Sequence, residues 1–266
     1  MSSGGSVGPP VDPRPARWPE RQPIEGRYVT LAPIEASHAP ALYEQLCGAG
    51  LSPEVRSAVW RYLPGAKEGF ETQAEFTEHI AQLPESRDPF YYTVLLPKTS
   101  ADEKADDDTN PGTGTGTPVG YLAYLNIERG HRSVEIGWVT FSPALQRTRA
   151  ATEALALAIE HAVQNLGFRR VEWKCDALNV RSRRAAERLG FAPEGLFRAH
   201  RIVRGRNRDT AWYAIVDDED WVRGRVGAAL KAWLRPDNFR ADGSQVKKLE
   251  EIREQLRRDG GGDRGV

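Results

Sequence analysis

Residues 141–154 read Phe-Ser-Pro-Ala-Leu-Gln-Arg-Thr-Arg-Ala-Ala-Thr-Glu-Ala and indicate the fold more than any other segment of the chain. It leaves an apolar strand pattern, passes through a turn rich in arginine and threonine, and enters a helix whose apolar stripe continues to Leu166. The first turn of a helix offers backbone N–H groups that lack intrahelical acceptors, together with the positive end of the helix dipole. The stretch therefore predicts an anion-binding turn, and a phosphate is its natural ligand.

The sequence on both sides of this turn predicts a mixture of strands and helices. Strands are predicted for residues 27–32, 89–97, 119–128, 133–141, 170–175, 191–203 and 209–216. Besides the helix that ends at Leu166, helices are predicted for residues 38–46, 71–83 and 179–189, and a last helix begins between Asp217 and Asp220. This pattern predicts an α/β (α+β) fold.

The order of these elements, with these residues, resembles the GNAT superfamily of acyl-coenzyme A dependent N-acyltransferases, and within it the RimJ/RimL-like branch. Gln146 and Ala151 stand at the ends of the superfamily's Gln-x-x-Gly-x-Gly/Ala loop. The rest of the pattern is Thr152-Glu153-Ala154, Asn179-x-x-Ser182, Leu189-Gly190-Phe191 and Glu194-Gly195-x-Phe197-Arg198. The resemblance covers roughly residues 24–221 and implies a mixed, mostly antiparallel sheet that is splayed at the acyl-CoA site and flanked by helices.

The resemblance implies that acetyl-CoA is a cosubstrate whose pyrophosphate lies on the loop Gln146, Arg147, Thr148, Arg149, Ala150 and Ala151. We expect backbone N–H groups to line this site, with the Thr148 hydroxyl as a further donor. Arg149 stands where glycine is usual, so a close backbone approach requires Arg149 to keep a right-handed conformation. Its guanidinium can then contact a phosphate. The alternative is that Arg147 and Arg149 are solvated surface charges.

Asn179 and Ser182 follow the predicted strand 170–175 and share one helix face. In the family, the amide at the position of Asn179 bonds the pantetheine arm of the coenzyme; the alternative role is a helix N-cap. The superfamily often has a thiolate-protonating tyrosine three residues before Leu189, but this chain has Ala186 there. The RimJ/RimL-like branch then implies Ser182, or a water that it holds, as the acid; the alternative is a capping hydroxyl.

Glu135 is the candidate base, because it lies on the strand that leads into the turn, as an acidic residue does in many relatives. It shares a strand face with Ser133 and Gly137, which predicts a polar face toward the acceptor. The alternative is a structural ion pair with a nearby arginine. His200 and Glu194 are further candidates.

Composition limits the class of protein. Among 266 residues, Lys+Arg and Asp+Glu both count 37, so the whole chain has no electrostatic attraction to nucleic acid or membrane. The basic stretch 198–208 is a local exception, and one such stretch is weak grounds for a nucleic-acid partner. The two cysteines, Cys47 and Cys175, exclude a disulfide framework. The start of the chain resembles no signal peptide, so we expect a cytoplasmic protein without a membrane partner.

The domain organisation follows from low-complexity stretches. We expect a disordered tail over residues 1–23, one domain over residues 24–234, and a charged, largely flexible tail over residues 235–266. Residues 98–117 are rich in Asp, Lys, Gly and Thr and predict a loop inserted into the domain.

Two functions remain open from the sequence. The first is an N-acetyltransferase that passes an acetyl group from acetyl-CoA to a primary amine of a small molecule or a protein N-terminus, with no metal and with a homodimer as a possibility. The second is an acyl-CoA-binding module without turnover, which Arg149 and Ala186 support.

Overall fold

The computed structural model describes residues 8–65, 69–97 and 116–261. Its centre is an eight-stranded sheet with the order β1-β2-β3-β4-β5-β6-β8-β7. The strands are β1 (Ile24–Glu25), β2 (Thr30–Pro33), β3 (Phe90–Pro97), β4 (Gly116–Glu128), β5 (Ser133–Phe141), β6 (Arg170–Asp176), β7 (Ala192–Val203) and β8 (Arg206–Val216). Only β5 and β6 pair in parallel, so the predicted mixed, mostly antiparallel sheet is confirmed.

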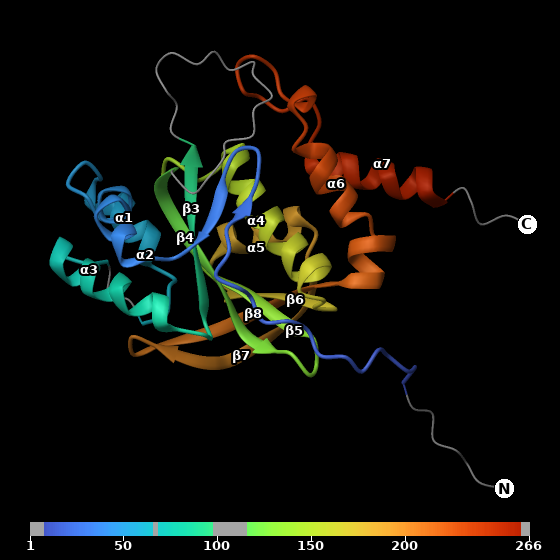
Figure 1. The fold of residues 1–266 in the computed structure, drawn as a ribbon, viewed down its shortest axis with the longest axis horizontal. Coiled ribbons are helices and arrows are strands. Elements are labelled where there is room, and N and C mark those ends of the chain that lie inside the picture. The colour runs from blue at the N-terminus through green and yellow to red at the C-terminus, as the bar shows by residue number, and fades with distance from the viewer. Residues whose placement is uncertain (1–7, 66–68, 98–115, 262–266) are drawn as a thin grey trace, which may run out of the picture.

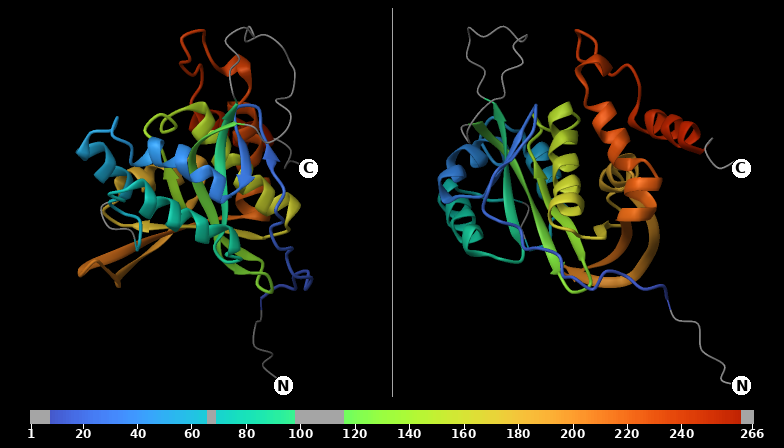
Figure 2. Two further views of the ribbon diagram at one scale, coloured as in Figure 1. Left: turned by 60° about the vertical axis from the view of Figure 1, so that its left-hand side comes forward. Right: turned by 45° about the vertical axis from the view of Figure 1, so that its right-hand side comes forward.

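Helices cover both faces of this sheet (Figure 1; Figure 2). They are α1 (Ala39–Leu46), α2 (Pro53–Trp60), α3 (Gln73–Gln82), α4 (Arg149–Glu160), α5 (Val180–Leu189), α6 (Val226–Trp233) and α7 (Leu249–Gly261). We call the two sides the α1–α3 face and the α4–α6 face. Each has its own core: Leu42, Trp60 and Phe76 pack on the first, and Ala154, Trp173 and Leu230 pack on the second.

The sheet opens between β5 and β6. Their parallel pairing begins at Ser133 with Arg170 and ends at Glu135 with Glu172, after which β5 pairs only with β4. Trp138 has a left-handed backbone (φ 50°), and the register of β4 and β5 shifts opposite it. The backbone of β5 beyond Glu135 is therefore free on the side that faces β6, which confirms the predicted splay.

The structure differs from the sequence expectation at both ends of the domain. Ala16 is buried and donates its backbone N–H to the Arg129 carbonyl, so the ordered chain begins before residue 24. After residue 235, Leu249 and Ile252 of α7 are buried in the core that includes α6. Both segments looked too polar to fold alone, and each is held by a few apolar side chains that meet the rest of the domain. Tertiary contacts therefore extend the domain at both ends.

Two helices also differ from the prediction. The helix α2 was not among the expected helices. It starts with Ser52 as N-cap and Pro53 at its first position. The last predicted helix is interrupted, since a short helix Asp217–Arg223 stops before Arg225, which has a left-handed backbone (φ 59°), and α6 follows. The predicted loop 98–117 lies outside the described residues except Gly116 and Thr117, which begin β4.

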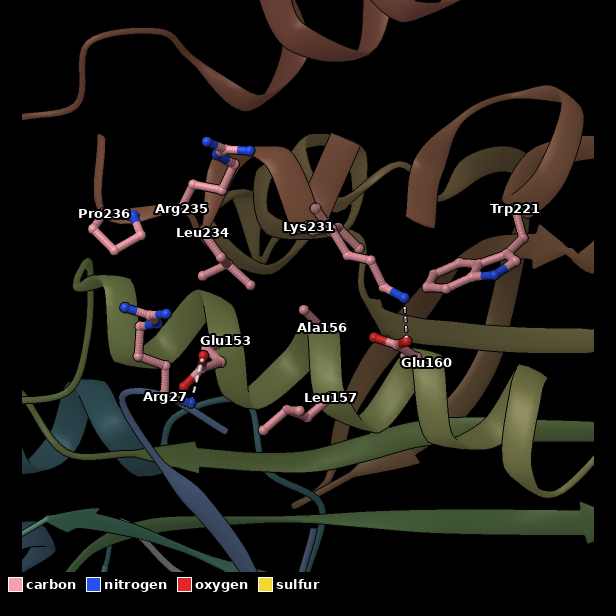
Figure 3. Close-up of a pocket in the computed structure, with 11 residues that line it drawn as sticks. Arg27, Glu153, Ala156, Leu157, Glu160, Trp221, Lys231, Leu234, Arg235 and Pro236 are labelled. Carbon is pink, nitrogen blue, oxygen red and sulfur yellow. Dashed lines mark hydrogen bonds and ion pairs between the residues drawn. The ribbon is translucent and has the colours of Figure 1, made fainter. Parts of the chain in front are cut away.

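Glu153 fixes α4 to the start of the sheet (Figure 3). Its carboxylate accepts hydrogen bonds from the backbone N–H groups of Arg27 (3.0 Å), Tyr28 (2.5 Å) and Val29 (2.9 Å), in the turn between β1 and β2. A cavity of about 290 Å³ lies beside this contact, between α4 and α6, and an ion pair joins Lys231 to Glu160 across it (2.7 Å). In the described part of the chain, no helix is long and apolar enough to cross a membrane.

Candidate active site

The start of α4 is built by Arg147 and Thr148. Arg147 adopts a left-handed backbone (φ 63°), which turns the chain into the helix. The Thr148 hydroxyl caps α4, since it accepts a hydrogen bond from the Ala151 N–H (3.0 Å) and donates to the Leu145 carbonyl (2.6 Å). Both hydrogen-bonding functions of this hydroxyl are therefore used inside the turn, and the expectation that it is a free donor to a phosphate does not fit this structure.

Three backbone N–H groups remain free at this helix start. Within the described residues, those of Arg147, Arg149 and Ala150 donate to no protein acceptor, whereas the N–H of Ala151 is bound by Thr148. Together with the helix dipole they form an anion-binding position at the carboxyl end of β5. Such donors suit a phosphate group, and the assignment of this loop to the coenzyme pyrophosphate stays a prediction.

Arg149 is the first residue of α4 and its backbone is not left-handed, so the condition for a close backbone approach holds. Its guanidinium carbon lies 5.1 Å from the Tyr28 ring and 4.6 Å from the Phe239 ring. These are cation–π distances, and they fix the side chain beside the loop. Gln146 is exposed and donates from Nε2 to the Phe141 carbonyl (2.8 Å), which ties the loop to the end of β5.

Asn179 and Ser182 lie at the start of α5. Asn179 is the N-cap, because its Oδ1 accepts from the Ser182 N–H (3.2 Å), and within the described chain its Nδ2 has no protein acceptor. The Ser182 oxygen accepts a hydrogen bond from Trp173 Nε1 (2.9 Å), and its own hydroxyl proton is directed at the Cys175 thiol. Asn179 is therefore the N-cap of α5 through Oδ1, and its Nδ2 group can still donate a hydrogen bond to a ligand.

Glu135 belongs to a chain of alternating charges on the α1–α3 face. Its Oε2 accepts from Asn126 Nδ2 (2.7 Å) and pairs with Lys174 Nζ (2.9 Å). Lys174 also pairs with Glu172 (2.7 Å), which pairs with Arg170 (2.7 Å). Burial alone would raise the pKa of Glu172, but the hydrogen bonds from Lys174 and Arg170 bring it below its usual value. Glu135 therefore does form a structural ion pair, the alternative to its role as the base, but its partner is a lysine and not an arginine.

The second oxygen of Glu135 points toward the splay. Within the described residues, Oε1 has no hydrogen-bond donor, and a methyl group built on Gly137 would lie 3.5 Å from it. The carboxylate is nearly buried, with 8% of its side chain exposed. One oxygen is therefore held by Lys174 and Asn126, and the other is directed along β5 to the point where β5 and β6 part.

The two predicted catalytic residues lie on opposite faces of the sheet. Glu135 pairs with Lys174 on the α1–α3 face, whereas Ser182 contacts Trp173, whose side chain belongs to the core of the α4–α6 face. Since the sheet is open beyond Glu135 and Glu172, the two faces meet there. The geometry suits a reaction in which one reactant approaches from each face.

The other candidates have structural partners. Glu194 pairs with Arg170, and His200 Nδ1 lies 2.9 Å from Thr210 Oγ1. Burial raises the pKa of the Cys175 thiol, although the Ser182 hydroxyl lowers it in part, so a reactive thiolate is not favoured. No group of three or more His, Cys, Asp or Glu side chains within the described ranges is arranged to hold a metal ion.

Two contributions to the site were missed in the sequence. Lys174 was not singled out, although its position two residues after Glu172 on a strand places both side chains on one face. The second is the motif Thr152-Glu153-Ala154. The Thr152 hydroxyl accepts a hydrogen bond from Arg188 of α5 (3.1 Å), and Ala154 is buried. The Glu153 carboxylate holds the turn between β1 and β2. The motif therefore supports α4 behind the anion-binding turn.

Known proteins share both sequence and fold with this chain. The model of the acetyltransferase (GNAT) domain matches residues 29–192, which is more than half of the chain. A GCN5-related N-acetyltransferase from Brucella melitensis is 36% identical over 91% of this chain and 98% of its own, with a TM-score of 0.77. That similarity includes most of the region after residue 192.

Two relatives from Bacillus subtilis (strain 168) are more distant. YnaD, an N-acetyltransferase by name, is 29% identical over 39% of this chain and 59% of its own length. YdaF, whose name assigns it provisionally to the ribosomal N-acetyltransferases, is 29% identical over 39% of this chain and 56% of its own. The match therefore spans less than two thirds of either relative, and the second name is consistent with the RimJ/RimL-like branch. With the splayed sheet and the anion-binding start of α4, these matches establish that the chain belongs to the GNAT family of acetyltransferases.

Proposed function

We propose that the protein is an N-acetyltransferase that transfers an acetyl group from acetyl-CoA to a primary amine by direct attack. The observation that carries the proposal is the opening between β5 and β6, which has free backbone donors at the start of α4 and a free carboxylate oxygen on the opposite face. The acceptor is a small molecule or a protein N-terminus, and we infer a cytoplasmic enzyme.

The α4–α6 face supplies the coenzyme site in this proposal. The N–H groups of Arg147, Arg149 and Ala150 bind the pyrophosphate, and Asn179 Nδ2 donates to the pantetheine arm. Gln146, Thr148 and Ala151 shape the loop without direct donation, since their polar groups are used within it. The coenzyme supplies an activated acyl group as a thioester, and these residues hold it at the opening of the sheet.

Proton movement falls to Glu135 and Ser182. Glu135 Oε1 receives the ammonium group of the acceptor and takes its proton, directly or through one water, while Lys174 and Asn126 hold Oε2 in place. On the opposite face, Ser182, or a water that it holds, passes a proton to the sulfur as the carbon–nitrogen bond forms and the carbon–sulfur bond breaks. A proton from solvent restores the hydroxyl, whose oxygen accepts from Trp173 Nε1. Neither role requires a metal ion.

A charge placed at the anion-binding turn tests the coenzyme site. Ala150→Asp puts a carboxylate beside the three free N–H groups and should weaken binding of acetyl-CoA by about 1 kcal/mol or more. Calorimetry measures this loss, and Ala144→Asp, on the exposed part of the turn before the loop, is the matched control. Equal affinities for both variants would reject the site.

An assay of transfer separates the enzyme from the alternative, a binding module. Acetyl transfer to a panel of primary amines, followed by mass spectrometry, should yield acetylated product with the wild-type protein. Binding of acetyl-CoA without product from any amine would favour the module. A homodimer is compatible with the exposed edge strand β7, and the oligomeric state can be measured by light scattering.

A further inference from the structure

The hairpin of β7 and β8 carries a positive charge that the proposed reaction does not use. Five arginines lie between residues 198 and 208, and in the described chain none of them has a carboxylate at ion-pair distance. One, Arg204, donates from its guanidinium to the carbonyls of Trp60, Arg61 and Leu63 after α2. The hairpin tip is thereby fixed beside the α1–α3 face.

Three of these arginines face the same way as Glu135. The pairing of β6 with β8 is regular from Arg170 with Val216 to Asp176 with Thr210, so alternate residues of β8 share a face. Trp212 lies under Lys174 Nζ, 4.1 Å from the ring centre, which places it on the face of Glu135. By alternation, Arg208 and Arg206 follow on that face, and Arg201 pairs with Arg208.

An aromatic surface separates the arginines from Glu135. The rings of Phe197 and Trp212 are 4.7 Å apart, and His200 packs edge-on against Phe197 at 5.4 Å. Phe197 remains 49% exposed, although it is a large apolar side chain. The face therefore runs from a carboxylate oxygen at the splay, over aromatic side chains, to a basic hairpin tip. We call this surface the acceptor strip.

We propose that the acceptor strip binds an acidic N-terminal peptide segment, whose α-amine reaches Glu135 and whose carboxylates reach Arg201, Arg206 and Arg208. This inference rests on the proposed function and names the class of its acceptor. Glu172 and Glu194 are already paired with Lys174 and Arg170, so of these three glutamates only Glu135 keeps a free oxygen, and that oxygen fits a single ammonium group at the opening. Asp176, farther along β6, accepts from the Leu178 N–H through one of its oxygens. A polyamine would bring further cations to a basic surface.

The length of the strip favours a peptide over a small molecule. Trp212 is opposite Lys174, the neighbour of Glu135, and Arg208 and Arg206 lie four and six residues farther along β8. At about 3.3 Å per residue, the arginines lie roughly 13 to 20 Å from that point. An extended peptide has the same rise, so its acidic residues should fall about four to six positions after the amine.

The test compares short peptides that differ only at residues four to six, which are aspartate, glutamine or lysine. Mass spectrometry measures kcat/KM for acetylation of each N-terminus. Since one exposed charge pair changes an equilibrium by about two- to fivefold, several pairs should favour the acidic over the neutral peptide by about tenfold. The lysine peptide should be the poorest, and salt should reduce the differences.

The double variant Arg201→Gln/Arg206→Gln removes two exposed charges and should bring the ratio of acidic to neutral kcat/KM toward one. Arg258→Gln, on α7, changes another exposed arginine, away from the strip, and should keep the ratio of the wild type. Equal kcat/KM for all peptides, or an acidic preference retained in the double variant, would overturn the inference while the proposed function stands.

Two other results have distinct meanings. Acetylation of small amines but of no peptide would also overturn the inference alone, whereas failure to bind acetyl-CoA in calorimetry would remove the proposed function as well. Fluorescence anisotropy with a labelled RNA oligonucleotide tests the competing partner. RNA binding that the double variant abolishes, without any preference among peptides, would assign the hairpin to nucleic acid and reject the peptide.

Discussion

Lys174→Met removes the cation that joins the carboxylates of Glu135 and Glu172 on the α1–α3 face. Lys174 lies 2.9 Å from Glu135 and 2.7 Å from Glu172, and the side chains of Lys174 and Glu135 are only 14% and 8% exposed. Removing one partner of a buried pair costs about 3–5 kcal/mol. Glu172 keeps Arg170 and the site is not fully dry, so we expect a loss of about 2–3 kcal/mol in the free energy of unfolding.

The same change should slow catalysis. Without Lys174, Oε2 of Glu135 keeps only the Asn126 amide as a partner, so the carboxylate is held less firmly at the opening of the sheet. A base displaced from its acceptor works less efficiently, so kcat/KM should fall by roughly tenfold or more. The rate is measured with acetyl-CoA and a primary amine, and stability is measured by urea denaturation.

Lys231→Met is the matched control for Lys174→Met. Lys231 also pairs with a glutamate, Glu160, at 2.7 Å, but it is 61% exposed and lies on the other side of the molecule. An exposed pair contributes about 0–1 kcal/mol, so this variant should lose little stability and keep the kcat/KM of the wild type. If both variants lose equal stability and neither lowers kcat/KM, the reasoning on Lys174 is refuted.

Three further predictions concern single positions. Glu135→Gln should lower kcat roughly 10²-fold and remove the acidic limb with coenzyme affinity nearly unchanged; a wild-type kcat and profile would leave Glu135 a structural residue. Glu153→Gln should cost about 1–3 kcal/mol in urea denaturation, because the amide cannot accept from three N–H groups. Burial raises the pKa of Glu153, so the wild type should lose stability as pH rises through that pKa, and the glutamine variant should not. Leu249→Ala, at a buried position of α7, should cost about 2–4 kcal/mol in urea denaturation, and no loss would show that α7 is not packed.

Local signals in the sequence were sufficient to predict the elements that position the site. Thr148 and Asn179 cap α4 and α5 through hydrogen bonds to residues three positions later, and Gly190 ends α5 with a left-handed backbone (φ 104°). Such interactions depend on a few neighbouring residues, so a sequence pattern contains them. The prediction of the anion-binding turn rests on the same kind of signal.

Contacts between distant segments could not be predicted in this way. Arg149 lies against Tyr28 and Phe239, and Glu135 pairs with Lys174 only because β5 and β6 run in parallel up to Glu172. The sequence does not show the register in which β5 and β6 pair. The ion pair of Glu135 was therefore expected with an arginine and not with Lys174. The helix α7 lies in the tail that was expected to be largely flexible, because its stability comes from burial of side chains against α6 and not from its own charged sequence.

The ion pair of Glu135 does not prevent it from acting as a base. Lys174 and Asn126 occupy one oxygen, and the other oxygen, which faces the opening of the sheet, is left to receive an ammonium group. Transfer of the proton then becomes easier once the acceptor amine and the acyl group exclude water from the opening. Lys174 thus contributes by position: together with Asn126 it holds the carboxylate where the two faces of the sheet meet.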